Sequence, residues 1–579
     1  MKNSSFCTLR GVLAFGVAAA VATLAIGESR AEGLNPVLPP LSYVKAKSLK
    51  SNPQAWSQFL AQLPHRSGPA PSATAPRDVP DYGGTWQALP QNTGVSSGLS
   101  NPLLLTDGTV IFNDSGTANW WKLTPDITGS YVNGTWTQIA SLPVIDSTQY
   151  APLYFASAVL PDGRVIIEGG EYQDFNPTWT NDGAIYDPVA NAWTAVNPPS
   201  GWGYDSDGDG VIGDSESTVL ADGTYMLAGC CNYPDQEALL DASSLTWTFT
   251  GAPNAGGSYQ DEQGYNLLPN GNVLTIDIWT DYPGSASPTN AEQYVPSSGV
   301  WTSAGNTPTS LVDPAACATY EIGPAVMRPA GTLVAFGGNT GCTSPFRDPT
   351  AIYDTSAGTW SAGPFVPTVC GTKKTKPCDL ADAPGSMLPN GNVLFAASSG
   401  YGDVPTHFFE YTAGNVIHQV ADPLYNAHDS GAYYYNLLML PNGQILMTDF
   451  SDQAEVYNQT GTHEASWAPV ISSTGHPTSV VLGDTYTLSG TQLNGLTQGA
   501  YYGDDVQAAT NFPIVQITNK ATGHVFYART TNPSTRSIEP GASSSVSFTV
   551  SAATETGGST LVVIADGIAS KPVAVNVKK

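Results

Sequence analysis

Short apolar runs separated by turns that end in glycine recur through the central part of the chain. Each copy has an apolar run, then a turn ending in Asp-Gly, Asn-Gly or Ala-Gly, then a second apolar run. Asp-Gly and Asn-Gly between β-rich runs are the strongest short-range signal of a β-hairpin. The pattern predicts seven hairpins, with turns at Gly108, Gly163, Gly223, Gly271, Gly331, Gly391 and Gly443.

The spacing of these turns indicates a repeat, because successive turn glycines are 55, 60, 48, 60, 60 and 52 residues apart. Some copies continue with a Tyr-Asp strand and a tryptophan, as Tyr186 does with Trp193 and Tyr353 with Trp360. A period of about 50 residues with four short strands is typical of kelch repeats, which form β-propellers. We predict an all-β fold in which residues 81–469 form a seven-bladed kelch-type β-propeller, with residues 84–89 as the outer strand of the last blade.

The two flanking regions differ from the repeat. In residues 470–579, Val, Thr and Ser alternate in strand-length runs, with Gly and Asn between the runs. This composition favours an Ig-like β-sandwich. Residues 32–80 are rich in Pro, Ser and Ala, so we predict a linker or strap with one short helix at about residues 56–63.

Residues 1–31 have the pattern of a secretory signal peptide. Lys2 and Arg10 precede an apolar, Ala-rich stretch, and the small residues Ser29 and Ala31 follow it. We expect cleavage near Ala31; the alternative is an uncleaved membrane anchor, for which the apolar stretch is short. The prediction is an exported protein, periplasmic or extracellular, with no membrane insertion after signal cleavage.

Charge narrows the range of partners. The 579 residues include 21 Lys and Arg against 48 Asp and Glu, which gives a net charge of −27. A chain this acidic is not expected to bind nucleic acid or an anionic membrane surface. Apolar residues make up 41% of the chain, which is enough for a large core. The oligomeric state stays open.

Six cysteines remain once the signal peptide is removed. An even number in an oxidising compartment predicts disulfides. Cys370 and Cys378 bracket a short Lys-rich loop, and Cys317 and Cys342 fall within one predicted blade. The remaining pair, Cys230 and Cys231, would form a strained vicinal disulfide, with two free buried thiols as the alternative.

Residues 205–216 match the twelve-residue calcium loop of EF-hands. Aspartates stand at positions 1, 3 and 5, glycine at position 6 and glutamate at position 12, and position 7 supplies a carbonyl oxygen. The predicted calcium ligands are Asp205, Asp207, Asp209, Val211 and Glu216. The usual flanking helices are not evident, and the alternative is an acidic Asp-Gly turn.

Equivalent positions of the first strand in each blade should converge on the central channel of a propeller. Nine residues before the turn glycines stand Leu99, Tyr154, Asp214, Glu262, Ile322, Asp382 and Tyr434. Clustered carboxylates repel one another unless a cation or a proton is present, so this hub could bind a divalent cation, or a polyol through its carboxylates and tyrosines. The predicted ligand-binding residues are Tyr154, Glu262, Glu321, Asp382, Tyr433, Tyr434, Asp504 and Asp505. Asp214, Glu262 and Asp382 are candidate catalytic residues for acid–base hydrolysis, and a purely structural role is the alternative.

A secreted kelch propeller followed by an Ig-like domain resembles the galactose oxidase and glyoxal oxidase superfamily, and residues 490–493 and 501–505 are similar to its C-terminal domain. The resemblance implies a copper radical site with a Cys joined to a Tyr, an axial Tyr and two His ligands. In the register above, Asp214 stands at the Cys position, Glu262 at that of its Tyr, Tyr433 at the axial Tyr and Tyr434 at the first His. The second His falls near residues 504–507, which contain none, and His428 and His524 are out of register. We therefore do not expect copper.

Together these patterns predict an exported, noncatalytic protein that binds a carbohydrate or a cell-surface partner and has one calcium-stabilised loop. Residues 433–435 are three tyrosines, which could stack on a sugar or simply pack against a neighbouring blade. The alternative is an enzyme, either a carbohydrate-active hydrolase that uses the hub carboxylates or an oxidase with an altered metal site.

Overall fold

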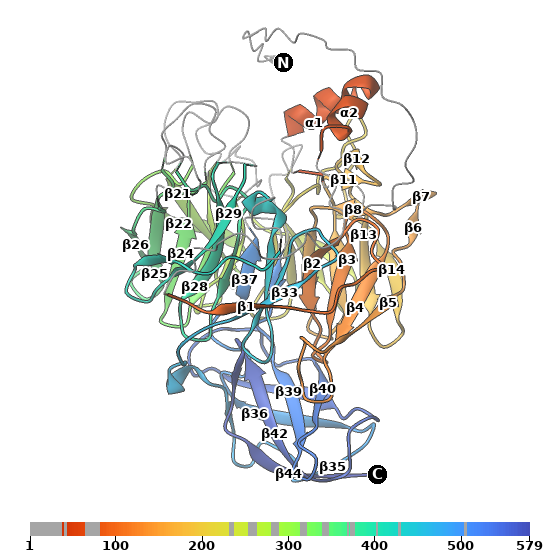
Figure 1. Cartoon of the computed structure of the whole chain (residues 1–579), viewed down its shortest axis with the longest axis vertical. Coiled ribbons are helices and arrows are strands. Elements are labelled where there is room, and N and C mark those ends of the chain that lie inside the picture. The colour runs from red at the N-terminus through yellow and green to blue at the C-terminus, as the bar shows by residue number, and fades with distance from the viewer. Residues whose placement is uncertain are drawn as a thin grey trace.

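The computed structural model describes residues 38–39, 43–63, 82–230, 237–252, 263–278, 289–312, 321–338, 347–367, 370, 377–400, 403–425, 430–502 and 507–579. These residues form an all-β structure with two short α-helices near the N-terminus (Figure 1). None of the helices in these ranges is both long and apolar enough to cross a membrane. The predicted signal peptide, residues 1–31, lies outside the described residues.

Within the described residues, seven antiparallel sheets form the central part of the molecule, and each contains four strands in meander order. One of them has six strands in all, because a C-terminal hairpin adds two strands to its four. The first three sheets are β2 (Leu99–Leu104), β3 (Val110–Asp114), β4 (Trp120–Thr124), β5 (Thr135–Ile139); β9 (Ala156–Val159), β10 (Val165–Glu168), β13 (Gly183–Asp187), β14 (Ala192–Val196); and β15 (Ser217–Val219), β16 (Tyr225–Leu227), β17 (Ala238–Asp241), β18 (Thr246–Phe249). The next two are β19 (Asn266–Leu267), β20 (Val273–Ile276), β21 (Asn290–Val295), β22 (Val300–Asn306); and β23 (Ala325–Arg328), β24 (Thr332–Phe336), β25 (Thr350–Asp354), β26 (Thr359–Ala362). The last two are β27 (Pro384–Met387), β28 (Val393–Ser398), β29 (Thr406–Tyr411), β30 (Ile417–Gln419); and β31 (Asn436–Met439), β32 (Ile445–Thr448), β33 (Glu455–Asn458) with β1 (Thr85–Ala88).

The first strands of these sheets contact one another in a closed cycle. Each contacts the first strand of the next sheet, and β31 contacts β2. The cycle is closed in the chain as well, because β1 pairs with β33, with Trp86 opposite Tyr457. This confirms the prediction that residues 84–89 provide an outer strand. A ring of radially repeated four-stranded sheets is the architecture of a β-propeller.

The seven predicted turns are all present. Each turn glycine has a φ between 77° and 95°, in the left-handed region that glycine adopts without a steric penalty. Each also donates its N–H to the carbonyl three residues earlier, at 2.7–3.0 Å. In the first turn, Asp107 Oδ1 additionally accepts the N–H of Thr109 at 3.1 Å. Local turn chemistry therefore accounts for the repeat.

The recurrent tyrosine and tryptophan join the outer strands to the neighbouring sheet. Tyr186 and Trp193 are cross-strand partners whose ring centroids lie 5.1 Å apart. Trp193 Nε1 then donates to the carbonyl of Ala140 in the preceding sheet at 3.0 Å. Trp360 makes the equivalent bond to Ala304 at 3.1 Å. Each such pair therefore stabilises its own sheet and also the contact between two sheets.

The C-terminal region forms one continuous curled sheet below the ring (Figure 1). Its strands are β34 (Val470–Ile471), β35 (Ser479–Val481), β36 (Thr485–Thr491), β39 (Ile514–Asn519), β40 (Val525–Thr531), β41 (Ser543–Thr549), β42 (Gly557–Ala565), β43 (Ile568–Ala569) and β44 (Val573–Lys578). Strand β40 pairs with β39 through its first half and with β41 through its second half. The two halves of the sheet enclose one apolar core, which includes Leu488, Phe548 and Val563. These strands curl as one sheet around a shared core, and the Ig-like sandwich stays a prediction.

A hairpin from the C-terminal region enters the ring. Its strands are β37 (Gly499–Tyr502) and β38 (Ala508–Ala509), and β37 pairs with β27. Strand β38 contacts β2 and β9 on the other side of the channel. Gln498, just before β37, donates from Nε2 to Thr218 Oγ1 at 2.9 Å and accepts the N–H of Leu267 at 2.7 Å. The hairpin is thus hydrogen-bonded to several sheets of the ring.

Two helices, α1 (Tyr43–Lys50) and α2 (Pro53–Leu60), lie on the face of the ring opposite the C-terminal sheet (Figure 1). Asn52 caps α2 by accepting the N–H of Ala55, and Pro53 occupies its first turn. The sequence predicted one helix at residues 56–63. The observed α2 begins three residues earlier, and α1 was not predicted because its lysine-rich sequence has only a weak apolar face.

The described cysteines agree in part with the predicted pairing. Cys370 and Cys378 form a disulfide with a Cα–Cα distance of 4.9 Å, as predicted. Cys230 is also disulfide-bonded. Cys231, Cys317 and Cys342 lie outside the described residues, so the other two predicted pairs remain predictions. A disulfide is consistent with an oxidising compartment.

Candidate functional site

Four tyrosines gather on the ring face beneath the helices, and we call them the tyrosine cluster: Tyr154, Tyr172, Tyr433 and Tyr434. Tyr154 follows β8 (Pro152–Leu153), Tyr172 lies in β11 (Tyr172–Gln173), which pairs with β8 and with β12 (Asn176–Pro177), and the last two lie in the 3-10 helix η1 (Ala432–Tyr434). Ring centroids are 6.3 Å apart for Tyr154 and Tyr172 and 4.1 Å apart for Tyr433 and Tyr434. The structure therefore brings together three tyrosines that the register predicted. Tyr172 was missed because it lies outside the repeated position.

Burial controls the protonation of this cluster. Loss of solvent raises the pKa of Tyr154 and of Tyr172 well above the usual range, and the neighbouring tyrosines and Glu171 raise them further. Asp214 adds to the effect on the pKa of Tyr172. These phenols stay protonated at neutral pH and act as hydrogen-bond donors.

Asp214 is held by a tryptophan that the sequence analysis did not select. Trp179 Nε1 donates to Asp214 Oδ1 at 2.9 Å, and both side chains are buried. Gly213 lies between the Trp179 ring and the sulfur of Cys230, where a Cβ atom would overlap the ring. Gly213 also has a φ of 58°. Close packing therefore orients the Asp214 carboxylate next to the tyrosines.

The tyrosine cluster is covered by the chain itself. Tyr154 Oη donates to the carbonyl of Leu38 at 2.8 Å, and Tyr172 Oη donates to that of Pro39 at 2.6 Å. The Leu38 side chain is only 1% exposed. The predicted sugar-stacking surface is therefore buried beneath the N-terminal segment and is not an open platform.

The calcium-type loop contacts α1 from the same segment. Asp205 Oδ1 accepts the N–H groups of Asp207 and Asp209 at 2.8 and 3.0 Å, which closes the loop. Lys47 Nζ lies 2.8 Å from Asp205 Oδ2 and 3.1 Å from Asp207 Oδ2. Lys50 Nζ lies 2.8 Å from Asp209 Oδ1. Two lysine side chains therefore pair with all three aspartates and offset two of their three negative charges.

The contacts of residues 205–216 show how far this loop is arranged to bind calcium. Asp205 and Asp207 share one cation, so their oxygens converge on one point, as a calcium loop requires. Glu216, the predicted bidentate ligand, is fully buried, and the Val211 N–H is bound by Asn181 Oδ1 at 2.7 Å. Within the described ranges, no group of three or more His, Cys, Asp or Glu side chains is arranged to hold a metal. The five predicted ligands are not assembled in this conformation, and calcium binding stays a prediction.

The remaining predicted hub residues are only partly described. Asp382 and Glu321 are each 2% exposed, and the Asp382 N–H donates to the Ile322 carbonyl at 3.1 Å, which joins two neighbouring sheets. Asp382 has a φ of 54°, a strained value for this residue type. Glu262, Asp504, Asp505 and His428 lie outside the described residues. The convergence of Glu262 with Asp214 and Asp382 therefore stays a prediction.

His524 does not belong to the hub. Its Nδ1 lies 2.7 Å from Glu555 Oε1, and both side chains are about one-third exposed on the C-terminal sheet. It is therefore no substitute for a missing hub ligand, as its sequence register had indicated.

Several buried carboxyl groups escaped the sequence analysis because they lie outside the repeated hub position. Burial raises the pKa of Glu237 to about 7, although Trp301 Nε1 donates to its carboxyl at 2.8 Å. Burial and Glu292 raise the pKa of Asp277 to about 7. Burial and Asp182 raise the pKa of Glu168 well above the usual range. Glu168 lies at the end of β10, and Glu237 and Asp277 adjoin β17 and β20, so these groups contribute to pH-dependent stability.

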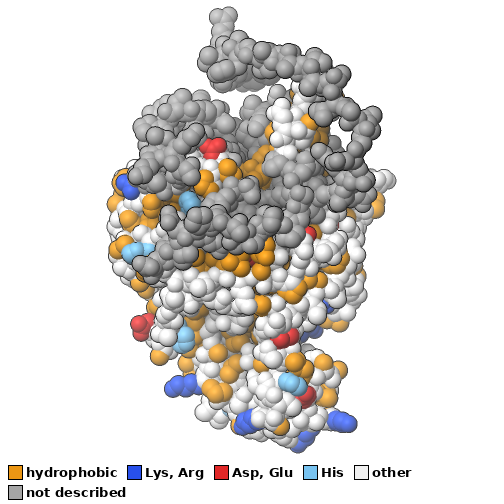
Figure 2. All heavy atoms as spheres, in the orientation of Figure 1, with side chains coloured by type: hydrophobic (Ala, Val, Ile, Leu, Met, Phe, Trp, Pro, Cys, Tyr) orange, Lys and Arg blue, Asp and Glu red, His pale blue; other side chains and the backbone are white. Residues whose placement is uncertain are grey.

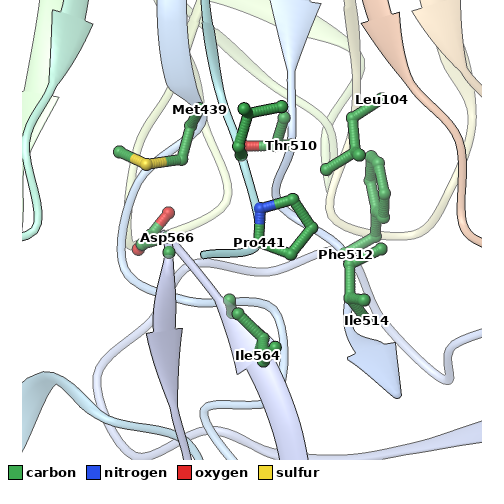
Figure 3. A pocket seen from close by; sticks show the side chains of 11 residues that line it. Leu104, Met439, Pro441, Thr510, Phe512, Ile514, Ile564 and Asp566 are labelled. Carbon is green, nitrogen blue, oxygen red and sulfur yellow. The ribbon is translucent and has the colours of Figure 1, made fainter. Parts of the chain in front are cut away.

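A small cavity lies where the ring meets the C-terminal sheet (Figure 3). It measures about 10 Å³, which is room for one water molecule. Asp566 beside it accepts the N–H of Leu496 at 2.7 Å and the hydroxyl of Thr497 at 2.9 Å. These bonds shape the turn that leads into β37. The cavity is therefore part of the junction and is too small for an organic ligand.

Comparisons with known proteins assign no family to this chain. No protein-family model matches it, and no curated protein matches it in sequence. A fungal alcohol oxidase of the AA5 family, solved in complex with copper, is 13% identical over 86% of this chain and 100% of its own length, with a TM-score of 0.47. The WD40 β-propeller domain of Doa1 is 9% identical over 65% of this chain and 97% of its own length, with a TM-score of 0.37. An extracellular domain of a one component system from B. thetaiotaomicron is 10% identical over 85% of this chain, with a TM-score of 0.39, and this chain covers 59% of that protein's length. Likeness at this level supports no argument about activity.

Proposed function

We propose that this chain is an exported kelch-repeat protein that binds a carbohydrate or a cell-surface partner at the tyrosine cluster, without chemical turnover. In this proposal residues 81–469 are a seven-bladed propeller and residues 470–579 an Ig-like domain. The observation that supports binding is the convergence of four tyrosines and the Asp214 carboxylate on one face of the ring. Aromatic rings that stack and phenols that donate suit a polyol ligand.

Charged residues are sparse in this chain. Charged residues make up 12% of the chain, and few are visible over the ring in Figure 2. The Lys and Arg side chains seen in that view lie mainly on the C-terminal sheet.

The donor set does not suit a copper radical centre. The copper radical site that the resemblance implies needs two imidazole ligands, and the cluster offers phenols and a carboxylate. Described histidines have partners elsewhere: His407 pairs with Asp422, and His418 stacks on Tyr82. The alternative proposal is a hydrolase that uses Asp214, and its support is limited to the burial of that carboxylate.

Binding can be tested on the mature protein with a panel of immobilised polysaccharides. Asp214→Asn removes the carboxylate charge and Tyr433→Phe removes one hydroxyl. Each should weaken binding about five- to tenfold, since one hydrogen bond contributes roughly 1–1.4 kcal/mol. Tyr486→Phe on the C-terminal sheet is the control and should bind as the wild type does. Equal binding by all variants would refute the site, and release of reducing sugar would favour the hydrolase.

Calcium at Asp205, Asp207, Asp209, Val211 and Glu216 is a separate proposal that rests on the loop sequence. Hard oxygen donors at this spacing suit calcium. Mass spectrometry of the purified protein and melting curves with calcium or a chelator provide the test. Stoichiometric calcium and a melt that rises with calcium would support the loop, whereas no bound calcium and no shift would identify it as an acidic turn. Stoichiometric copper would refute the proposal of a noncatalytic protein.

A further inference from the structure

We propose that residues 38–39 and 43–63 form a cap, held by lysine–aspartate ion pairs, that occupies the tyrosine cluster and has to be displaced before a ligand can reach it. The nature of that ligand rests on the proposed function. The existence of the cap rests on contacts among described residues only.

Apolar contacts position the cap over the cluster. Leu38 is buried in the same core as the four tyrosines. Leu49 of α1 and Trp56, Phe59 and Leu60 of α2 pack against this core while remaining partly exposed. The Trp56 ring centroid lies 6.3 Å from that of Tyr172. A ligand that stacks on these rings would need the space that the cap fills.

Hydrogen bonds make the competition specific. The phenols of Tyr154 and Tyr172 donate to the successive carbonyls of Leu38 and Pro39. These are the donors that a hydroxylated ligand would use. Cap and ligand therefore compete for the same groups, and binding by one excludes the other.

Ion pairs connect the cap to the calcium-type loop. Lys47 and Lys50 are three residues apart in α1 and so share one side of the helix. Lys50 reaches Asp209, whose side chain is fully buried, while Lys50 itself is 28% exposed. Burying a carboxylate without a nearby cation costs free energy, so Lys50 of the docked cap stabilises the buried charge of Asp209.

The cap depends on docking for its structure. Each helix has eight residues, which is shorter than the roughly 12–15 residues that an isolated helix needs in water. Helix α2 has no fully buried residue. Removing the ion pairs should therefore undock and unfold α1 and α2 while the ring stays intact.

Hydrogen–deuterium exchange of the full mature protein tests this inference. In Lys47→Glu/Lys50→Glu, amides of residues 43–60 and 171–178 should exchange at least tenfold faster, with no change in strands β2, β3 and β4. Lys47→Arg/Lys50→Arg keeps both charges and should exchange as the wild type does. The control variant Lys571→Glu/Lys578→Glu changes the net charge by the same amount on the exposed end of the C-terminal sheet. In this variant the amides of residues 43–60 and 171–178 should stay protected.

Wild-type protein offers a second test that needs no substitution. Raising the salt from about 20 mM to about 500 mM should speed exchange in residues 43–60, because salt screens the exposed part of the ion pairs. Unchanged exchange in the Glu variant and in high salt would overturn the cap. An opened cap without polysaccharide binding would refute only the proposed ligand. Polysaccharide binding that leaves residues 43–60 fully protected would refute only the cap.

Discussion

Lys50 Nζ lies 2.8 Å from Asp209 Oδ1, and the Asp209 side chain has no exposed surface, whereas that of Lys50 is 28% exposed. The two partners are 159 residues apart in the chain. The pair joins the N-terminal cap to a loop of the ring and buries one of its two charges more deeply than the other. This asymmetry has a measurable consequence.

Removing the charge of Lys50 should destabilise the docked helix α1 more than removing the charge of Asp209. Lys50→Gln leaves a buried carboxylate without this cation, whereas Asp209→Asn leaves a lysine that can turn into solvent. We expect Lys50→Gln to lower the free energy of opening of α1 by about 1–2 kcal/mol more than Asp209→Asn does. Exchange protection of residues 43–50 measures both values. Equal losses would mean that the aspartate reaches water when the lysine is absent.

Gly213 and Gly208 offer a matched pair of substitutions. Both have positive φ, at 58° and 79°, so alanine costs about 1 kcal/mol in backbone strain at either position. A Cβ at Gly208 meets nothing within 4 Å, whereas one at Gly213 overlaps the Trp179 ring. Gly213→Ala should therefore cost at least about 2 kcal/mol more than Gly208→Ala in urea unfolding. Similar losses would show that Trp179 and Asp214 move apart easily.

Stability should fall as the pH rises through neutrality. Burial raises the pKa of Glu237 to about 7 in the folded state, so the native protein keeps a proton that the unfolded chain releases near pH 4.5. The contribution of Glu237 to the free energy of unfolding is fully present below pH 4.5 and is lost as the pH rises to about 7, by on the order of 3 kcal/mol. Urea unfolding of the wild type and of Glu237→Gln between pH 5 and pH 8 measures the slope. The variant should show a flatter profile, and an unchanged slope would assign the dependence to other groups.

Arg536 should stabilise the contact between the C-terminal sheet and the ring. It is fully buried, and its guanidinium donates to the carbonyls of Val159 and Asn511 at 2.9 and 3.0 Å. Arg536→Met fills a similar volume but leaves these carbonyls unpaired, so we expect a loss of about 3 kcal/mol or more. Arg529→Met is the control, because the Arg529 side chain is part-buried at the same contact and makes one long bond to Asp162. Calorimetry measures the loss of stability in each variant. Equal losses in Arg536→Met and Arg529→Met would contradict this expectation.

Only some of the residues at the tyrosine cluster could be predicted from the sequence. Tyr154, Tyr433 and Tyr434 were predicted because they occupy or adjoin one register position in the repeat. Tyr172 and Trp179 lie in the connection between β10 and β13, within one copy of the repeat, where no periodic signal exists. Cap contacts were equally inaccessible, since a linker-like composition gives no indication of where the segment docks.

The sequence by itself determined the local structure: seven glycine turns with positive φ, antiparallel hairpins, and tyrosine–tryptophan pairs across adjacent strands. These features follow from steric limits and hydrogen bonds between residues that are close in the chain. Only the tertiary structure decided that Lys47 meets Asp205 and that Leu38 lies on Tyr154, across separations of 158 and 116 residues. Closure of the ring creates the face on which these residues meet, and such a face exists only after distant strands have packed. Local chemistry specifies the repeat, and long-range packing creates the site and covers it.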